Sequence, residues 1–242
     1  MEVESQKRQK SLAVLVDPDK LSSGNKKRLV EACKKSPIDY IFYGGSLVQE
    51  ERANSFIEEL KEHIKAPIVI FPGHPLQVYP NADAILFLSL ISGRNPEFLI
   101  GHHVVAAPHI KKSGLEIIPT AYILVDGGVP TSASYMSNTH PIPRDKPDIA
   151  ACTAMAGNML GLGTVYMDAG SGAQKSINSE MISKVKANID GPLIVGGGIR
   201  DVSSLLEASN AGADILVVGN AFEKDPDLIY SFAECLKKEN VQ

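Results

Sequence analysis

Short runs of apolar residues recur along this 242-residue chain, separated by longer segments in which apolar and polar residues mix. Most runs are continuously apolar rather than alternating, which is typical of parallel strands covered on both faces. We interpret eight runs as strands: Leu12–Val16, Tyr40–Tyr43, Ile68–Phe71, Ala84–Leu88, Ile117–Leu124, Thr164–Met167, Leu193–Val195 and Ile215–Val218.

Most segments between these runs carry apolar residues at the spacing of a helix that buries one face. They predict helices at Asn25–Lys35, Ser46–Lys65, Glu97–Ala106, Asp148–Leu160, Ser179–Ile189, Val202–Asn210 and Asp227–Lys238. Alternating strands and helices require a parallel sheet, and a (β/α)8 TIM barrel takes about 250 residues. We therefore expect an α/β fold in which residues 1–242 form one (β/α)8 barrel domain.

One connection departs from this alternation. Between the third and fourth strands, Pro72–Asp83 holds three prolines in twelve residues, and proline in a helix interior costs about 3 kcal/mol. We predict that this segment is not helical, so that the barrel lacks its third outer helix. The gap would open the barrel flank to an apolar ligand, although a shortened loop without a role would give the same pattern.

A second irregular stretch, Gly127–Lys146, follows the fifth strand and also holds three prolines. Loops of this length are usually functional lids or mobile insertions. We expect one of these two at the barrel mouth.

The composition narrows the classes of function. The formal net charge is −4, and no run of lysine and arginine indicates a nucleic-acid surface. The first ten residues are mostly polar, unlike a signal peptide, and no apolar stretch of about 18 residues could span a bilayer. Cys33, Cys152 and Cys235 show no metal-ligand spacing and are expected to be reduced packing residues. We expect a cytoplasmic protein, and its apolar helix surfaces favour a homo-oligomer.

Two glycine-rich strand ends near the end of the chain predict a phosphate site. The seventh strand ends at Gly196–Gly198 and the eighth at Gly219–Asn220, and a helix-like segment follows each. Glycine lets backbone amides approach an anion, and a helix N-terminus attracts it further. Phosphate sites in (β/α)8 barrels commonly follow strands 7 and 8. We expect a phosphate monoester at Gly197, Gly198, Gly219 and Asn220.

Carboxylates after the first strand predict a magnesium site. Asp17 and Asp19 flank a proline there and Lys20 follows, and Mg²⁺ prefers oxygen ligands shared with substrate phosphates. Aspartate and proline are also common at helix N-termini. We favour the metal role for Asp17 and leave Asp19 open between the two. Ser46, after the second strand, is either a helix N-cap, which its local sequence favours, or a neutral oxygen beside the metal.

The sixth strand ends in an unusual group of side chains. Tyr166, Asp168 and Ser171 lie there together with Gly170 and Gly172. Each of them has a structural explanation on its own. A phenol, a carboxylate and a hydroxyl beside two glycines are nevertheless more typical of a substrate site than of a turn.

Five strand ends resemble the geranylgeranylglyceryl phosphate synthase family in order and spacing. They are Asp17–Lys20, Tyr43–Ser46, Tyr166–Gly172, Val195–Arg200 and Val218–Asn220, and the resemblance covers nearly the whole chain. The family consists of (β/α)8 prenyltransferases that join sn-glycerol 1-phosphate to a polyprenyl diphosphate with Mg²⁺. It also lacks the third barrel helix, in agreement with the proline-rich segment.

The resemblance implies both the reaction and the site. It implies ether-bond formation between sn-glycerol 1-phosphate and geranylgeranyl diphosphate in phospholipid biosynthesis, with diphosphate released and Mg²⁺ as cofactor. It places the metal on Asp17 and Ser46. It places glycerol phosphate on Tyr166, Met167, Asp168, Ala169, Gly170, Ser171, Gly172, Gly197, Gly198, Gly219 and Asn220. We expect the prenyl chain in an apolar groove beside Pro72–Asp83.

The chain departs from the family pattern at one position. The sixth strand of the family reads Tyr-x-Glu-x-Gly-Ser, and its acidic residue is regarded as the catalytic base, whereas Asp168 stands here. The shorter side chain retracts the oxygens by about 1.5 Å, and a misplacement of about 1 Å can cost roughly 10²-fold in rate. We predict an active enzyme in which Asp168 is the base, because a carboxylate can act through one water.

Two other functions are compatible with the sequence. An isomerase or aldolase acting on a sugar phosphate would share the phosphate site and need neither a metal nor an apolar groove. A Schiff-base aldolase would require a lysine at a strand end, whereas Lys20 lies three residues past Asp17. A barrel that binds its phosphate ligand without catalysis is also compatible with the aspartate at position 168.

Overall fold

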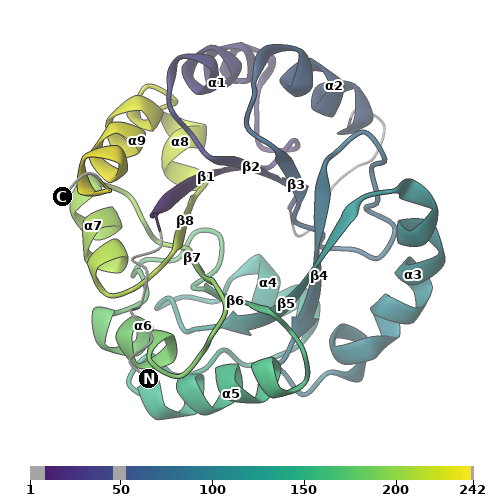
Figure 1. The fold of residues 1–242 in the computed structure, drawn as a ribbon, viewed down its shortest axis with the longest axis vertical. Helices are drawn as coiled ribbons and strands as arrows, with labels where there is room; N and C mark the ends of the chain where they lie inside the picture. Colours follow the sequence, from purple (N-terminus) through teal and green to yellow (C-terminus); the bar gives the residue numbers. More distant parts are fainter. Residues whose placement is uncertain (1–8, 46–52, 241–242) are drawn as a thin grey trace, which may run out of the picture.

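The computed structural model of the chain describes residues 9–45 and 53–240, which fold around a closed ring of eight parallel strands. Each strand pairs with its sequence neighbours, and β8 pairs with β1 to close the barrel (Figure 1). The predicted (β/α)8 fold is confirmed. The strands are β1 (Ser11–Val16), β2 (Tyr40–Tyr43), β3 (Ile68–Ile70), β4 (Ala84–Leu90), β5 (Glu116–Leu124), β6 (Thr164–Asp168), β7 (Leu193–Gly196) and β8 (Ile215–Val218).

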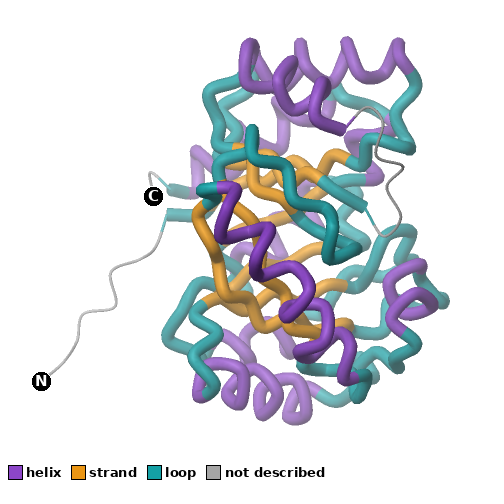
Figure 2. Tube along the Cα trace, turned by 90° about the vertical axis from the view of Figure 1, so that its right-hand side faces the viewer, coloured by secondary structure: helices purple, strands orange, loops and turns teal. Residues whose placement is uncertain are grey.

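Helices surround the ring of strands (Figures 1 and 2). They are α1 (Ser23–Lys35), α2 (Ala53–His63), the π-helical turn η2 (Glu97–Gly101), α3 (His102–Ser113), α4 (Ser132–Ser137), α5 (Pro147–Met159), α6 (Ser179–Lys186), α7 (Val202–Asn210), α8 (Asn220–Lys224) and α9 (Leu228–Glu239). The helix predicted from Ser46 is described only from Ala53, because residues 46–52 lie outside the described chain. None of the described helices is long and apolar enough to cross a bilayer.

Strand side chains alternate between the barrel interior and the surrounding helices. In β1, Leu12, Val14 and Val16 belong to the larger buried cluster between strands and helices, whereas Ala13 belongs to the cluster inside the barrel. The same alternation directs Asp17, the residue after β1, toward the interior side of the mouth.

Four aromatic rings, which we call the aromatic floor, fill the interior below the mouth. Phe71 stacks on Tyr166 with ring centroids 5.2 Å apart, and Tyr122 meets these two rings nearly edge-on at 5.8 and 5.4 Å. The Phe42 ring lies 6.4 Å from Tyr166. Aromatic pairs in such geometries contribute about 0.5–1.5 kcal/mol beyond the burial of their area. The functional groups of the mouth lie directly above this floor.

The segment Pro72–Asp83 is not helical, as its prolines predict. Gly73 N–H donates to the Gln77 Oε1 at 2.7 Å, and the Tyr79 ring meets the Tyr43 ring edge-on at 6.0 Å. Both Gln77 and Tyr79 are buried. Their contacts hold an irregular segment against the flank of the barrel where a third outer helix would otherwise lie.

The helix after β4 is longer than predicted. It begins as the π-helical turn η2 and continues as α3 to Ser113, past the expected end at Ala106 and with Pro108 inside it. Ala106 and Ile110 are buried on its inner face. Burial of this face offsets the roughly 3 kcal/mol that an internal proline costs.

The long loop after β5 contains a short helix that the sequence pattern did not predict. Thr131 caps α4: its Oγ1 accepts from Ser134 N–H at 3.3 Å, and the Ser134 hydroxyl accepts from Thr131 N–H at 3.1 Å. Farther along, Ile142 forms an isolated bridge with Val125. The loop therefore contains a capped helical turn and is tied back to the residue after β5.

The three cysteines are free thiols. Cys33 is buried and Cys235 is half-buried, which agrees with a packing role. Cys152 is exposed, so that interpretation is wrong for this residue. The helix α5 turns its alanine face, with Ala150 and Ala154, toward the core and leaves position 152 outside.

Candidate active site

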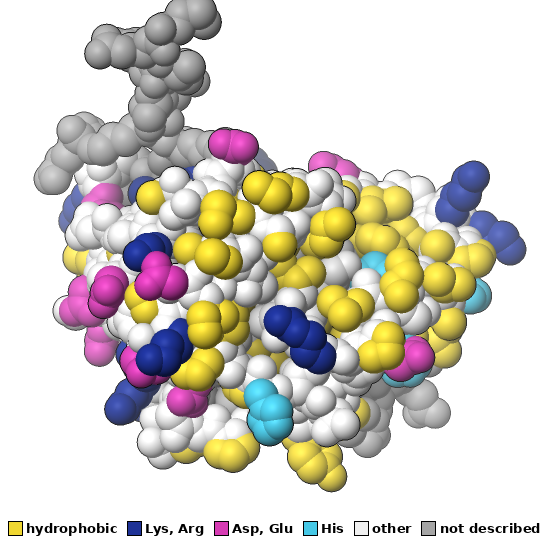
Figure 3. Space-filling view, turned by 90° about the horizontal axis from the view of Figure 1, so that it is seen from below, with side chains coloured by type: hydrophobic (Ala, Val, Ile, Leu, Met, Phe, Trp, Pro, Cys, Tyr) yellow, Lys and Arg dark blue, Asp and Glu magenta, His cyan; other side chains and the backbone are white. Residues whose placement is uncertain are grey.

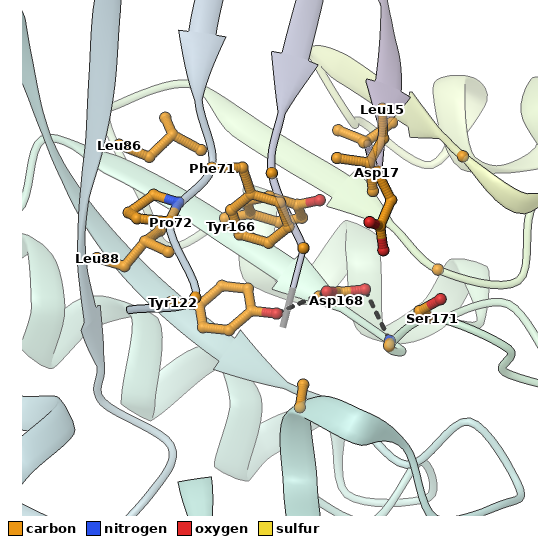
Figure 4. Close-up of a pocket in the computed structure, with 18 of the residues that line it drawn as sticks. Leu15, Asp17, Phe71, Pro72, Leu86, Leu88, Tyr122, Tyr166, Asp168 and Ser171 are labelled. Atoms are coloured by element: carbon orange, nitrogen blue, oxygen red, sulfur yellow. Dashed lines mark hydrogen bonds between the residues drawn. The ribbon is translucent and has the colours of Figure 1, made fainter. Parts of the chain in front are cut away.

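A cavity of about 470 Å³ lies at the carboxyl ends of the strands. Polar groups after β1, β6, β7 and β8 line one part of it, and apolar side chains from β4, α3 and the segment between β3 and β4 line the other. Figure 4 shows Asp17, Asp168 and Ser171 on one side and Leu86 and Leu88 on the other. The cavity therefore suits ligands that have a charged part and an apolar part.

Asp17 is a buried carboxylate after β1. Its Oδ1 accepts from Asp19 N–H at 3.2 Å, and its Oδ2 pairs with the Lys20 ammonium at 2.9 Å. The cap of the following helix is Ser22, whose Oγ accepts from Asn25 N–H at 3.3 Å. Neither Asp17 nor Asp19 therefore serves as the cap of this helix. Asp19 is exposed and does not line the cavity.

The surroundings of Asp17 fit a magnesium ion. A Cβ at Gly45 would lie 2.7 Å from the Asp17 Oδ2, so glycine there keeps the carboxylate approachable. Among the described residues, no group of three or more His, Cys, Asp or Glu side chains could hold a metal ion alone. Mg²⁺ usually shares its shell with substrate phosphates, so one protein carboxylate at this position is compatible with it. Ser46, the second predicted ligand, lies outside the described residues.

Asp168 is a buried acid held by two donors. The Tyr122 hydroxyl donates to its Oδ2 at 2.6 Å and Gly170 N–H donates to its Oδ1 at 2.7 Å (Figure 4). Burial raises the pKa of Asp168 above its ordinary value, and the two hydrogen bonds oppose that rise because they favour the carboxylate. The result is an oriented carboxylate that is more basic than a free aspartate, which suits a general base.

Tyr122 is a site residue that the sequence interpretation missed. It pairs in register with Tyr166, while Leu124 pairs with Asp168. Tyr122 therefore faces the interior in the same layer as Tyr166, and its hydroxyl reaches the carboxylate two residues farther along β6. Aligning the predicted ends of the fifth and sixth strands, Leu124 and Met167, would have placed Tyr122 opposite Val165. The contact therefore depends on a register that the predicted strand ends miss by one residue.

The predicted substrate residues of β6 do not all face the cavity. Tyr166 and residues 170–172 line it. Met167 and Ala169 are buried among the side chains between barrel and helices, because neighbouring residues of a strand point to opposite faces. Only the backbone atoms of these two residues could contact a ligand.

Glycines after β7 form a cradle beside Asp168. Gly197 and Gly198 have φ angles of 81° and 75°, a left-handed conformation that favours glycine. A Cβ at Gly197 would lie 2.7 Å from the Asp168 Oδ1 and 2.7 Å from Gly170 N. The ends of β6 and β7 can therefore approach each other only because this position is glycine. From β8, the cradle is completed by Gly219 and Asn220.

Lys20 links the carboxylate side of the mouth to this cradle. Its ammonium, paired with Asp17, also donates to the Ser171 Oγ at 3.0 Å. The Ser171 hydroxyl in turn donates to the Asn220 Oδ1 at 3.1 Å. A phosphate in the cradle would therefore meet a cation to which the sequence interpretation assigned no contact with phosphate.

The apolar part of the cavity is a groove beside Pro72–Asp83, as expected from the missing helix. The groove lies between β4 on its inner side and α3 on its outer side. Its lining includes Phe71, Leu86, Leu88, Phe98, Ala106 and Ile110. Their carbon surface offers a dry environment to a hydrocarbon chain that starts at the polar end of the cavity.

A glycine cradle beside buried carboxylates at the mouth of a closed barrel is typical of phosphate-binding (β/α)8 proteins, and the groove has the shape and lining that suit an apolar chain. The model of the PcrB family matches residues 4–236. The chain belongs to this family.

Curated relatives and solved structures agree with this assignment. The chain is 55% identical over 227 residues to geranylgeranylglyceryl phosphate synthase of Chitinophaga pinensis, covering 94% of this chain and 90% of the relative. It is 43% identical over 211 residues to the protein of the same name from Pyrococcus furiosus, and the match covers 87% of this chain and 83% of that relative. With a TM-score of 0.88 and 33% identity, it matches (S)-3-O-geranylgeranylglyceryl phosphate synthase from Thermoplasma acidophilum in complex with its substrate sn-glycerol-1-phosphate, covering 95% and 94%.

Replacing Lys20 with methionine should weaken the binding of inorganic phosphate. Hydrogen bonds to charged groups contribute about 1.5–3 kcal/mol, and because the Lys20 side chain is 44% exposed we expect the lower end, roughly a tenfold rise in Kd by calorimetry. Lys27→Met, which removes an exposed lysine of α1 outside the cavity, is the control. Equal Kd values for the two variants would place the phosphate away from Lys20.

Replacing Tyr122 with phenylalanine should raise the pKa of Asp168 further. Burial already raises this pKa, and the substitution removes a hydroxyl that favours the carboxylate, so the group stays protonated to a higher pH. NMR titration of ¹³C-labelled aspartate measures the change. Tyr166→Phe, which leaves the Tyr122 hydroxyl in place, is the control. A pKa in Tyr122→Phe at or below that of the parent protein would contradict the role given to this hydrogen bond.

Proposed function

We propose that this protein is a prenyltransferase that joins sn-glycerol 1-phosphate to geranylgeranyl diphosphate through an ether bond and releases diphosphate. The observation that carries the proposal is one cavity with an anion cradle at one end and an apolar groove at the other. Membership of the PcrB family and the 55% identity to a geranylgeranylglyceryl phosphate synthase support it. The product, a glycerol phosphate with an ether-linked chain, belongs to ether-lipid biosynthesis.

Glycerol 1-phosphate fits the polar part of the cavity. Backbone amides at Gly197, Gly198 and Gly219 surround its phosphate, with Ser171 and Lys20 beside them. Backbone N–H groups and a lysine are common partners of phosphate oxygens. The glycerol hydroxyls then lie near the carboxylate that adjoins the cradle.

Asp168 is the proposed general base. A glycerol hydroxyl attacks the first carbon of the prenyl chain, the bond from this carbon to the diphosphate oxygen breaks, and the hydroxyl proton passes to the Asp168 carboxylate. Burial raises the pKa of Asp168 and makes it a stronger proton acceptor. The donors on Tyr122 and Gly170 keep it oriented. General-base catalysis of this kind supplies typically about 10²–10⁴ in rate.

Mg²⁺ is the proposed cofactor, with Asp17 and Ser46 as its protein ligands. When bound, it would neutralise charge on the diphosphate leaving group. The Asp17 carboxylate faces the cavity, and Lys20 stands between it and the cradle. The two anionic groups of the substrates therefore have separate partners at the mouth.

The prenyl chain is proposed to occupy the apolar groove. Each buried CH₂ unit contributes about 0.8 kcal/mol, so about ten units against Leu86, Leu88 and Ile110 would contribute on the order of 8 kcal/mol before ordering costs are subtracted. Burial also keeps water away from the allylic carbon during the reaction.

The other two functions account for less of the structure. A short sugar phosphate gives the groove no role. Lys20 and Lys224, the lysines that line the cavity among the described residues, lie beyond strand ends, where a Schiff-base lysine is not expected. A barrel that only binds its ligand gives no role to Asp168, whose burial is costly for folding.

We further expect a homo-oligomer in the cytoplasm. Met159 and Leu160 at the end of α5 are large apolar side chains that are exposed, and they support self-association. The cytoplasmic location is expected from the composition of the chain.

Incubation with sn-glycerol 1-phosphate, labelled geranylgeranyl diphosphate and Mg²⁺ tests the function directly. We expect a labelled lipid phosphate and an equivalent amount of diphosphate. Binding of both substrates without product would favour the binding protein. Turnover of a sugar phosphate without labelled lipid would favour the isomerase or aldolase.

Substitutions at Asp168 test the base. Asp168→Asn should lower kcat by roughly tenfold or more, the low end of what a general base supplies, because an amide cannot accept the proton. Asp168→Glu should hold or raise kcat, because it restores the reach of the family residue. Turnover assays under saturating substrates measure both. Equal rates for the parent and Asp168→Asn would mean that the residue only positions glycerol.

Asp17→Asn should abolish the Mg²⁺-dependent turnover. Calorimetric binding of glycerol 1-phosphate should stay close to that of the parent, because the cradle does not include Asp17 and Lys20 remains available to the phosphate. Asp19→Asn, which changes an exposed neighbour by the same charge, is the control. Full activity of Asp17→Asn at limiting Mg²⁺ would remove Asp17 from the metal site.

A further inference from the structure

The outer wall of the groove, formed by η2 and α3, carries apolar side chains on both faces, together with His102 and His103 on the groove side. Its inner face, with Ala106 and Ile110, lines the groove. Its outer face carries Ile100, Val104 and Val105, which are 60%, 67% and 53% exposed. Large apolar side chains of an outer helix are normally directed toward the core and not toward water. The outer face of this wall therefore fits an apolar partner better than it fits water.

The helix on the other side of the Pro72–Asp83 segment is built differently. The inner face of α2 buries Phe56, Ile57 and Leu60, and its outer face exposes the charged residues Glu58, Glu59, Lys61 and Glu62. This is the usual pattern of an outer barrel helix. The apolar outer face of α3 is thus a local feature of the groove wall.

Apart from Glu97, the exposed first residue of η2, the wall is free of acidic side chains. Between Glu97 and Glu116 the sequence contains Lys111 and Lys112 but no aspartate or glutamate, although the formal net charge of the chain is −4. Both lysines are exposed in the last turn of α3. An apolar face that ends in basic side chains is complementary to an anionic lipid surface.

The neighbouring segment extends this face. Leu76 is exposed, and a small crevice joins its segment to α3 through side chains that include His109 and Lys112. Figure 3 shows hydrophobic side chains gathered toward the right-hand side, where α3 lies in Figure 1, with basic side chains at that edge. We define the outer patch as Leu76, Ile100, Val104, Val105, Lys111 and Lys112.

We propose that the outer patch docks on the surface of an anionic lipid bilayer. Its apolar side chains enter the headgroup region, and Lys111 and Lys112 contact lipid phosphates. Because the inner face of the same wall lines the groove, a prenyl chain can pass between the bilayer and the groove with little exposure to water. That transfer rests on the proposed function, whereas docking itself does not.

A second copy of this chain fits the outer patch less well. In a two-fold interface the same patch meets itself. Such an interface would contain Lys111 and Lys112 twice, and residues 98–115 provide no acidic side chain to pair with them. A bilayer with anionic lipids supplies the negative charge that a second copy of the patch lacks.

Vesicle flotation without substrates tests the docking. The parent protein should bind vesicles of phosphatidylcholine and phosphatidylglycerol. Ile100→Glu/Val104→Glu should bind them at least roughly tenfold more weakly, because it places carboxylates in an apolar contact. Lys111→Gln/Lys112→Gln should weaken this binding by roughly fivefold or more and leave any binding to pure phosphatidylcholine unchanged.

Ile149→Glu/Tyr230→Glu is the matched control, because it makes the same charge change at apolar positions that are 51% and 55% exposed on α5 and α9. It should bind vesicles as the parent does. Thermal melts identify any variant that fails to fold, and Ile100→Ser/Val104→Ser then takes the place of the glutamate pair.

Three outcomes would overturn the proposal: a parent that does not bind the mixed vesicles, a folded Ile100→Glu/Val104→Glu that binds like the parent, or a control that loses binding equally. Analytical ultracentrifugation measures the oligomeric state in parallel. If the parent does not bind vesicles and Ile100→Glu/Val104→Glu dissociates an oligomer, the outer patch is assigned to a second copy of the chain. Product formation from detergent-dispersed substrates is measured separately. A protein that docks but forms no product would refute the proposed function and leave the docking intact.

Discussion

A carboxylate buried beside a groove for hydrocarbon is the constraint on which the rest of the site depends. An isolated charge in such surroundings would be neutralised or would destabilise the fold. The chain satisfies this carboxylate, on Asp168, with the Tyr122 hydroxyl and Gly170 N–H. The position of the first donor follows from strand pairing, because β5 and β6 pair in register from Thr120 to Leu124. The chemistry at the mouth therefore depends on the register of strands well below it.

The same constraint separates charge from hydrocarbon around the mouth. The polar groups follow β1, β6, β7 and β8, which are consecutive in the closed ring, and the apolar lining comes from β4, α3 and the segment between β3 and β4. Replacing one outer helix by Pro72–Asp83 leaves space for the groove on that side. Each part of the proposed ligand, a phosphate-bearing lipid precursor, would thus have its own section of the wall.

Much of this arrangement can be predicted from the sequence because it depends on local patterns. Buried parallel strands give continuous apolar runs, and glycine at positions such as Gly197 marks a strand end that closely approaches its neighbour. Such local patterns do not show which elements far apart in the sequence contact each other. Tyr122 and Lys20 became site residues only when the closed barrel placed them beside Asp168 and Ser171. The continuation of α3 past Ala106 likewise depends on burial against the barrel, which outweighs the local signal of a proline.

The aromatic floor lies inside the barrel, between its two ends. Beyond it, at the amino ends of the strands, Lys10 donates to the Ala213 carbonyl at 2.7 Å, and Lys237 of the last helix pairs with Asp39 at 3.0 Å. Substitutions in regions that share no partners have nearly independent effects. Substitutions at that end should therefore change the free energy of unfolding with little effect on the hydrogen bonds that orient Asp168 at the mouth. In this sense the barrel separates an end that serves stability from an end that serves the reaction.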